Sequence, residues 1–513
     1  MSSAVEVQAG TSPLPDFEQA QKPTEGSQFL PIVAKPGRRL STEHKLTRLA
    51  FTVSRLTEFC SEKELVKQTG HAVQVWPLVV LKELMDNALD ACEEDETPPE
   101  IEITVEEDGT TTVTDNANGI ATETITAILD YNIRVSSREA YVSPTRGAQG
   151  NALKTILAMG YVLDRESDYS QEVNAEAVGV TLIETRGQLH RIEFKVDHVN
   201  TQPKLTHTVT PSPRERGTAI AVKWPATRKQ QRENWLLQSE DQFKELAESY
   251  VWFNPHLTLR GLWHGKEFVN VKATDPNWEK WRPRNPTSPH WYNESRLQRY
   301  LAAHVARDRE RKRERSVREF IAEFRGLSGT VVRGKILAEV GCSYQSLAQF
   351  FGVERVNRAG IKKLLAAMQK YSKPVAPKHL GVIGREHLQQ HFLAAGGNAE
   401  TFKYELEKGF TEDGIPFVIE LAFGLHQAGL TPQAGHVTRK FISGVNWSVA
   451  INNPFRTFGR TGQGLENMLA ELRVNAKEPV ICAVHLAMAH VRYADRGKSS
   501  IVLSGDDAEL SDE

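Results

Sequence analysis

Short segments in which hydrophobic and polar residues alternate recur along the first half of the chain. Such alternation is typical of β-strands with one buried face. Asp108 and Gly109 separate the first two of these segments and are typical of a tight turn, so a β-hairpin is predicted there. The segments with this pattern are 101–107, 110–115, 179–185, 190–196, 218–224 and 256–263.

Helical periodicity is strongest after Pro77, which the pattern places in the first turn of a helix that continues to residue 94. Proline is tolerated there because backbone nitrogens in a first turn have no acceptor within the helix. A helix followed by antiparallel hairpins, without regular alternation of strand and helix, predicts an α+β fold. Further helices are predicted at 45–70, 242–254, 296–324 and 464–473, and further strands at 416–425 and 479–488.

Changes in composition divide the chain into five predicted segments. Residues 1–44 are polar and dotted with proline, and they carry too little apolar surface to offset the entropy lost on ordering. Residues 273–295 and 373–381 interrupt the regular patterns with proline, as linkers do. The predicted segments are a disordered arm at 1–44, a first α+β domain at 45–270, a helical domain at 271–377, a second α+β domain at 378–503 and an acidic tail at 504–513.

The bulk composition is that of a globular protein. Hydrophobic residues make up 40% and charged residues 25% of the 513 positions, so sizeable cores can form. The formal net charge of −2 provides no global basic field, and any contact with DNA therefore requires local patches. The 4 cysteines are isolated, which argues against a disulfide framework or a zinc site. No apolar run approaches the roughly 20 residues that span a bilayer, and we expect an intracellular protein, cytoplasmic or nucleoid-associated.

A basic run occupies residues 307–318, with seven basic and three acidic side chains. The interpretation that we favour is a solvated helix laced with ion pairs between residues four apart. The alternative is a helix face that contacts phosphate groups.

The predicted helix after Pro77 carries Glu83, Asn87 and Asp90, which share one face because they lie at positions i, i+4 and i+7. A carboxylate can polarise a water molecule as a general base, and an amide oxygen can bind a hard cation such as Mg²⁺. Taken alone, the pattern is more typical of a solvated polar face. The motif therefore raises a hypothesis of catalysis and metal binding that depends on the rest of the chain.

A second motif, from Asp115 to Gly119 and Ile120, follows a predicted strand. The Asp115 carboxylate can accept a hydrogen bond from an exocyclic amine such as that of adenine. Gly119 allows the backbone to approach a flat ring closely. The alternative is a plain loop, in which Asp, Asn and Gly are common for turn reasons.

A third motif is a glycine-rich loop before an apolar helix. Backbone N–H groups at a helix N-terminus favour anions, so a triphosphate suits this site, and Lys154 adds positive charge. Such a loop alone is a weak signal, because ordinary helix N-termini use the same residues. The candidate ATP-binding residues here are Arg146, Gly147, Ala148, Gln149, Gly150, Asn151, Ala152, Leu153 and Lys154.

The order and spacing of the three motifs resemble those of the Bergerat-fold (GHKL) ATPases, the family of gyrase, MutL, histidine kinases and a class of heat-shock chaperones. The resemblance implies a Bergerat ATPase sandwich in which Glu83 activates water, Asn87 holds Mg²⁺ and Asp115 binds adenine. Asp90, Gly119 and Ile120 join the implied ATP-binding residues.

Within this family, several segments are similar to the B-type subunits of type VI DNA topoisomerases. Ser136 and Ser137 resemble a serine pair before the lid of the ATP site and are candidate ATP-binding residues. Gly497-Lys498 resembles a pair that reaches the γ-phosphate from the transducer domain, which makes Lys498 a candidate catalytic residue. The alternative is a surface lysine in a loop. Residues 271–377 would form a helix–two-turns–helix-like domain, and 378–503 a transducer-like domain. The similar stretches are 82–91, 145–154, 252–259, 416–425 and 484–501.

The resemblance implies an ATP-hydrolysing clamp that uses ATP and Mg²⁺ and dimerises when ATP binds. DNA cleavage would need a separate A-type partner, because no acidic cluster suited to cleavage follows in this chain. An assembly of two A-type and two B-type chains acting on double-stranded DNA is implied.

Two alanines favour an alternative, a scaffold partner of an A-like nuclease with reduced catalysis. Ala117 and Ala152 stand where the family has glycines, and alanine disfavours positive φ. Intact Glu83, Asn87 and Asp115 oppose this alternative. A chaperone of the same ATPase family is a third possibility, for which no client-binding region is seen.

Overall fold

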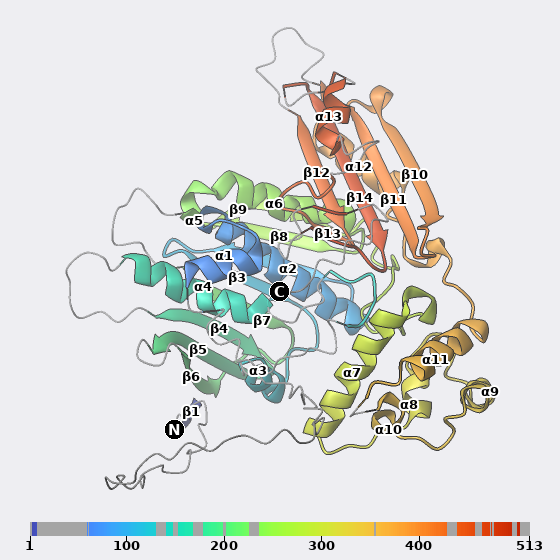
Figure 1. The fold of residues 1–513 in the computed structure, drawn as a ribbon. Helices are drawn as coiled ribbons and strands as arrows, with labels where there is room; N and C mark the ends of the chain where they lie inside the picture. The colour runs from blue at the N-terminus through green and yellow to red at the C-terminus, as the bar shows by residue number, and fades with distance from the viewer. Residues whose placement is uncertain are drawn as a thin grey trace, which may run out of the picture.

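The computed structural model describes residues 3–7, 59, 61–129, 140–146, 152–167, 178–197, 202–224, 235–352, 355–427, 439–456, 464–471, 473–474, 477–494 and 500–502. These residues form two mixed β-sheets, joined in the chain by a group of helices (Figure 1). Within these ranges, no helix is long and apolar enough to cross a membrane.

The first sheet contains nine strands among the described residues, in the order β1-β6-β5-β4-β7-β3-β2-β8-β9. Neighbouring strands are antiparallel except for the parallel pair β2–β8. Alternate residues of the central strands point to one buried face, so the period of two predicted from the sequence defines the core side of the sheet. The strands are β1 Ser3–Val7, β2 Glu100–Val105, β3 Thr110–Asp115, β4 Gly179–Thr185, β5 Gln188–Asp197, β6 Gln202–Pro211, β7 Thr218–Lys223, β8 Thr258–Trp263 and β9 Lys266–Val271.

Helices cover the buried face of this sheet. Helix α2 packs over β2 and β3, α4 over β4 and β5, and α6 over β8 and β9 (Figure 1). The core between the layers is apolar, and Ile103, Val113 and Ile183 within it are almost fully buried. The helices are α1 Glu62–Thr69, α2 Trp76–Glu94, α3 Thr122–Ile128, α4 Ala152–Ser167, α5 Trp235–Gln238 and α6 Glu240–Phe253.

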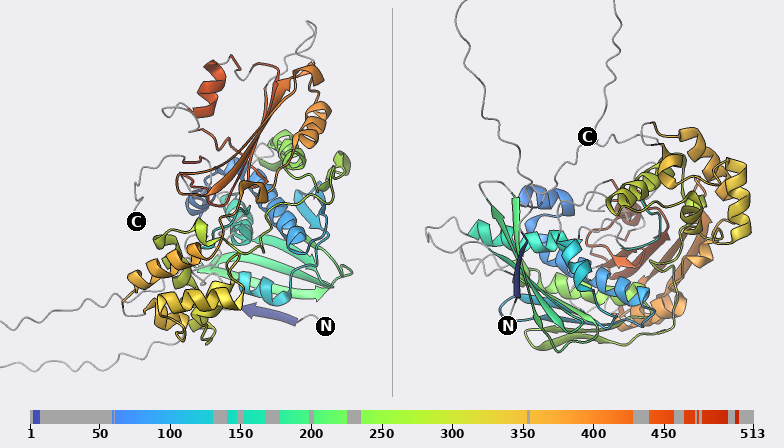
Figure 2. Two further views of the ribbon diagram at one scale, coloured as in Figure 1. Left: turned by 90° about the vertical axis from the view of Figure 1, so that its right-hand side faces the viewer. Right: turned by 90° about the horizontal axis from the view of Figure 1, so that it is seen from below.

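The remaining residues form a helical region and a second sheet. The second sheet has the order β10-β11-β14-β12-β13, and helices α12 and α13 lie on its opposite faces (Figure 2). The helical region comprises α7 Glu294–Glu310, α8 Val317–Ala322, α9 Thr330–Val340, α10 Leu347–Phe351 and α11 Arg358–Lys370. The second-sheet elements are α12 Arg385–Ala394, β10 Lys403–Phe410, β11 Pro416–Leu425, β12 Lys440–Val445, β13 Ser448–Val449, α13 Gly464–Glu471 and β14 Val480–Met488.

The α+β class is confirmed, and the first sheet with its helical layer fits the Bergerat sandwich with additional elements. The arm prediction is wrong for Ser3–Val7, which form β1 and pair with β6. The outer edge of β6 offers backbone donors and acceptors, and these pair with the short segment Ser3–Val7. The rest of the arm and the tail lie outside the described residues.

The long helix predicted at 296–324 is two helices. Helix α7 ends at Glu310, and Ser316 caps α8 through a reciprocal pair of hydrogen bonds with Glu319, which starts a new helix. The favoured interpretation of the basic run is therefore wrong at its second half. Arg315 is buried there and pairs with Glu323 and Asp308 instead of pairing with a residue four positions away.

Candidate nucleotide-binding site

Helix α2 carries the first motif, and its apolar face is held against the sheet. Its residues Leu84, Ala88 and Cys92 are buried. Glu83 is half-buried and Asn87 is exposed, and neither has a hydrogen-bond or ion-pair partner among the described residues. A carboxylate and an amide one turn apart on this helix are thus without a protein partner in the described ranges, and their roles in catalysis and metal binding stay predictions.

Asp115 lies in a polar row that crosses three strands. It pairs in register with Thr218 of β7, and Thr218 pairs with Thr185 of β4. Residues opposite each other on antiparallel strands point to the same face, so all three side chains face the helical layer. Each of the three is buried. The row therefore forms a polar floor in a sheet whose core face is otherwise mainly apolar.

Only one of the two oxygens of the Asp115 carboxylate accepts hydrogen bonds from the described part of the protein. Its Oδ1 atom accepts the backbone N–H groups of Ala117 (2.9 Å) and Thr218 (3.1 Å). No donor lies within hydrogen-bond distance of Oδ2 in the described part of the chain. Burial raises the pKa of Asp115 to about 6, against the lowering effect of these two hydrogen bonds. Oδ2 is thus the atom that could bind a ligand amine or hold a proton.

The loop after Asp115 tolerates alanine at the position where the family has its first glycine. Ala117 is buried and has no positive φ. Gly119 has φ +79, and a Cβ there would lie 2.5 Å from the hydroxyl of Thr185. That hydroxyl accepts the N–H of Ile120 (2.9 Å). The backbone requirement for glycine thus falls on Gly119 and not on position 117.

Two further site residues, Gly217 and Thr218, belong to none of the three sequence motifs. The sequence marks Thr218 only as the start of a strand, yet its Oγ1 is buried without a hydrogen-bond partner among the described residues. Gly217 has φ +80, and a Cβ there would lie 2.2 Å from the carbonyl oxygen of Asp115. A glycine and a threonine at the start of a strand are a weak signal, and the register with Asp115 is what distinguishes them.

Replacing Gly217 by alanine is expected to destabilise the protein by roughly 2–3 kcal/mol, since a left-handed residue and a backbone clash are combined. Gly265→Ala is the matched control, because Gly265 has φ +74 and no neighbour within 4 Å of the added Cβ. Denaturant unfolding measures the free energy of unfolding of both variants. The difference between them gives the cost of the clash at position 217. Equal losses of stability in the two variants would contradict the close approach of Gly217 to Asp115.

Much of the third motif lies outside the described residues. The same holds for Ser136, Ser137 and Lys498, and for the loop residues Gly147, Ala148, Gln149, Gly150 and Asn151. Helix α4 begins at Ala152, and Leu153 and Lys154 are buried in its first turn. The contacts predicted between the loop and phosphate groups remain predictions.

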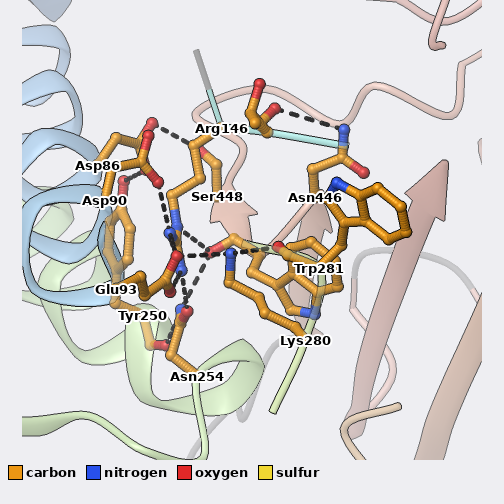
Figure 3. Close-up of polar contacts among 12 residues, drawn as sticks. Asp86, Asp90, Glu93, Arg146, Tyr250, Asn254, Lys280, Trp281, Asn446 and Ser448 are labelled. Carbon is orange, nitrogen blue, oxygen red and sulfur yellow. Dashed lines mark hydrogen bonds and ion pairs between the residues drawn. The ribbon is translucent and has the colours of Figure 1, made fainter. Parts of the chain in front are cut away.

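Arg146 lies in a buried network of charges instead of facing an open site (Figure 3). Its two terminal nitrogens donate to Glu93 (2.7 and 2.8 Å), and further bonds reach Asp90 (2.7 Å) and the Oδ1 atom of Asn254 (2.6 Å). Its Nε donates to the carbonyl of Trp447 (3.4 Å). All five N–H donors of the guanidinium are thereby used by protein acceptors.

The network is balanced in charge. Lys280 lies 2.6 Å from the second oxygen of Glu93, so Arg146 and Lys280 face Asp90 and Glu93. Burial acts to raise the pKa of Glu93, but Arg146 and Lys280 outweigh it and hold that pKa well below its usual range. Burial raises the pKa of Asp90 to about 6, and it lowers the pKa of Lys280 to about 8. The Asp90 carboxylate is therefore paired with Arg146, whereas Glu83 and Asn87 on the same helix have no partner among the described residues.

No group of three His, Cys, Asp or Glu side chains in the described ranges could hold a metal ion. Mg²⁺ commonly binds through one or two protein oxygens together with phosphates and water. The free amide of Asn87 fits that mode, in which a nucleotide would supply the remaining ligands.

Comparison with known proteins agrees with the motifs. No protein-family model matches the chain. The sequence is 24% identical over 462 residues to the B-type chain of the type 2 DNA topoisomerase 6 of Methanococcoides burtonii, and the match covers 85% of this chain and 66% of that protein. The chain thus spans slightly less than two thirds of the length of this relative.

The solved structures to which the chain is similar include two ATPase regions. The ATPase region of Saccharomyces cerevisiae topoisomerase II is 11% identical, with a TM-score of 0.34, over 82% of this chain and 76% of that one. The Aquifex aeolicus MutL ATPase domain complexed with ADP is 11% identical, with a TM-score of 0.31, over 79% and 90% of the two chains. In sequence, most of this chain is similar to the B-type chain of a topoisomerase VI, as its motifs indicated.

Proposed function

We propose that this chain is the ATP-binding and ATP-hydrolysing component of a topoisomerase VI-like complex, and that it closes as a dimeric clamp. The observation that carries the proposal is the polar row of Asp115, Thr218 and Thr185 on the helix-covered face of the sheet. The free side chains of Glu83 and Asn87 on the helix above that sheet support it.

In this proposal each polar group without a partner among the described residues has one role in binding or hydrolysing ATP. The Oδ2 atom of Asp115 accepts the amino group of adenine, and the Thr218 hydroxyl makes a further polar contact to the base. The Asn87 oxygen holds Mg²⁺, which neutralises phosphate charge when bound. Glu83 polarises the attacking water. The loop 147–154 binds the phosphates, and Lys498 contacts the terminal phosphate.

The similarity to the B-type chain of topoisomerase VI supports a proposed assembly. ATP binding joins two copies of this chain, and each copy associates with an A-type partner that cuts double-stranded DNA. Nucleotide contacts made only in the closed state shift the population toward closure, and hydrolysis reopens the clamp. We place this activity in the cytoplasm or at the nucleoid.

The second candidate function is a scaffold that does not turn over ATP. Its specific support is Arg146, which the resemblance placed in the ATP site but which donates all its N–H groups to protein acceptors. Such a scaffold would retain the fold and the A-type partner, but it would not depend on Glu83.

Sedimentation of the full chain with Mg²⁺ and a non-hydrolysable ATP analogue tests the proposal. A monomer that becomes a dimer only when the analogue is added supports the clamp. If the analogue changes neither the mass nor the thermal stability, the scaffold takes its place and Asp115 loses its assigned role.

The preference for adenine should depend on pH because Asp115 must be ionised to accept an amine. With a pKa of about 6, the ionised fraction increases about tenfold between pH 5 and pH 7. We expect ADP to gain about that factor in affinity over inosine diphosphate, whose 6-oxo group accepts a hydrogen bond instead of donating one. Titration of the phosphates is common to both ligands and cancels in the ratio. An affinity ratio that is constant with pH would exclude Asp115 as the adenine acceptor.

A further inference from the structure

The segment that leads into the glycine-rich loop is held by residues 285–292, which precede helix α7. The Val142 N–H donates to the hydroxyl of Tyr292 (3.0 Å), and the Thr287 hydroxyl donates to the carbonyl of Val142 (2.6 Å). The Tyr141 hydroxyl donates to the carbonyl of Asn285 (2.7 Å). Residues 141–146 thus form an anchor, which we call the anchor segment, immediately before Gly147.

The second sheet holds the same anchor segment through the turn between β12 and β13. Asn446 and Trp447 in this turn have φ +51 and φ +64, a left-handed backbone that non-glycine residues rarely adopt. The Trp447 N–H donates to Nε2 of His485 (3.0 Å), and Oδ1 of Asn446 accepts the N–H of Met488 (2.9 Å). A strained turn persists only when surrounding contacts stabilise it. The two hydrogen bonds to β14 provide such contacts.

The turn projects into the charge network (Figure 3). The Trp447 carbonyl accepts from Nδ2 of Asn254 (3.0 Å) and from Arg146, and the Trp447 ring lies 4.4 Å from the Lys280 ammonium. The Asn446 amide donates to the carbonyl of Thr145 (3.4 Å). The Trp447 side chain is completely buried. The turn is therefore part of the packing around Arg146.

The next residue, Ser448, reaches helix α2. Its hydroxyl donates to Asp86 (2.7 Å) and accepts from the Lys82 ammonium (2.8 Å). Lys82 directly precedes Glu83 in the chain, and Asp86 directly precedes Asn87. The second sheet thus contacts the very turn of α2 that carries the candidate base and the candidate metal ligand.

We propose that Asn446, Trp447 and Ser448 are positioning residues for the nucleotide site, supplied by the second sheet. While this turn is docked, Ser448 fixes the rotation of α2, and Asn446 with Trp447 fixes the base of the glycine-rich loop. Movement of the second sheet is thereby linked to the alignment of Glu83. This inference rests on the proposed function and adds to it a contact route that does not pass through Lys498.

Amide hydrogen exchange of the nucleotide-free full chain tests the positioning directly. Ser448→Ala should speed exchange in α2 about tenfold, since a buried bridge between two charged groups is lost. Asn446→Gly keeps the left-handed turn and should speed exchange in the anchor segment. Ser443→Ala is the matched control, because this buried serine of β12 makes no hydrogen bond to α2 in the described structure. Ser448→Thr restores the hydroxyl and should restore protection.

Steady-state kinetics separates positioning from general destabilisation. Ser448→Ala should lower kcat about tenfold and keep KM for ATP within about twofold, because the nucleotide contacts remain while Glu83 loses its alignment. If the exchange in Ser448→Ala and Asn446→Gly matches that in Ser443→Ala, the inference is overturned, whatever the nucleotide data show. If the wild type binds no ATP, the proposed function fails, and faster exchange would then support the turn only as a brace of α2.

Discussion

Replacing Glu83 by glutamine is expected to lower ATP turnover by roughly two to four orders of magnitude and to leave nucleotide affinity nearly unchanged. Glutamine has almost the same volume as glutamate but cannot take a proton from the attacking water. The half-buried Glu83 side chain has no hydrogen-bond or ion-pair partner in the part of the chain described, so its replacement breaks no contact that stabilises the fold. Phosphate release and equilibrium binding of a non-hydrolysable analogue measure the two quantities.

Glu94→Gln is the control for this experiment, because Glu94 is exposed at the far end of the same helix. Its turnover should equal that of the wild type. Full turnover in Glu83→Gln would contradict the assignment of Glu83 as the base. Loss of binding together with turnover would place Glu83 in ligand binding instead of catalysis.

Replacing Arg146 by methionine is expected to destabilise the protein by about 3–5 kcal/mol, the usual cost of removing one partner from a buried ion pair. Asp90 would lose its cation, and Glu93 would keep only Lys280 and His256. Methionine fills much of the volume of the arginine stem, so the effect arises from charge and not from a cavity. Denaturant unfolding monitored by tryptophan fluorescence measures the change.

Arg260→Met provides the contrast for a surface ion pair. Arg260 is exposed on β8 and contacts Glu102 and Glu267. Solvent screens such pairs, so this variant should unfold with the wild-type transition within error. If Arg146→Met is equally neutral, the buried network does not contribute to stability, and Arg146 becomes available for the phosphate contact that the resemblance implied.

Elements that depend on near neighbours in the sequence could be predicted with accurate bounds. Strands β3, β4 and β11 begin and end at the predicted residues. The helix after Pro77 ends at residue 94, as predicted. The sequence pattern does not predict strands β6, β9, β10 and β12. Strand β10 illustrates the reason, since it is largely exposed and half of its residues are charged, so its sequence does not indicate a buried face.

The candidate site likewise contains residues that the sequence predicts and residues that only the tertiary structure identifies. The types and spacing of Glu83, Asn87 and Asp115 are visible in the sequence because each lies in a short motif. Thr218 is separated from Asp115 by 103 positions, and only the register between β3 and β7 identifies it. Nothing local distinguishes it from other strand threonines.

By itself, the sequence determined the period and the ends of the main elements, the α+β class and the three motifs, because these follow from residues close together in the chain. Only the tertiary structure decided that Arg146 is enclosed by acceptors and that Trp447 contacts it across 301 positions. The acceptors of Arg146 come from α2, from the residue that follows α6 and from the β12–β13 turn. Their meeting depends on how the two sheets pack around one buried set of charges, which no local pattern encodes.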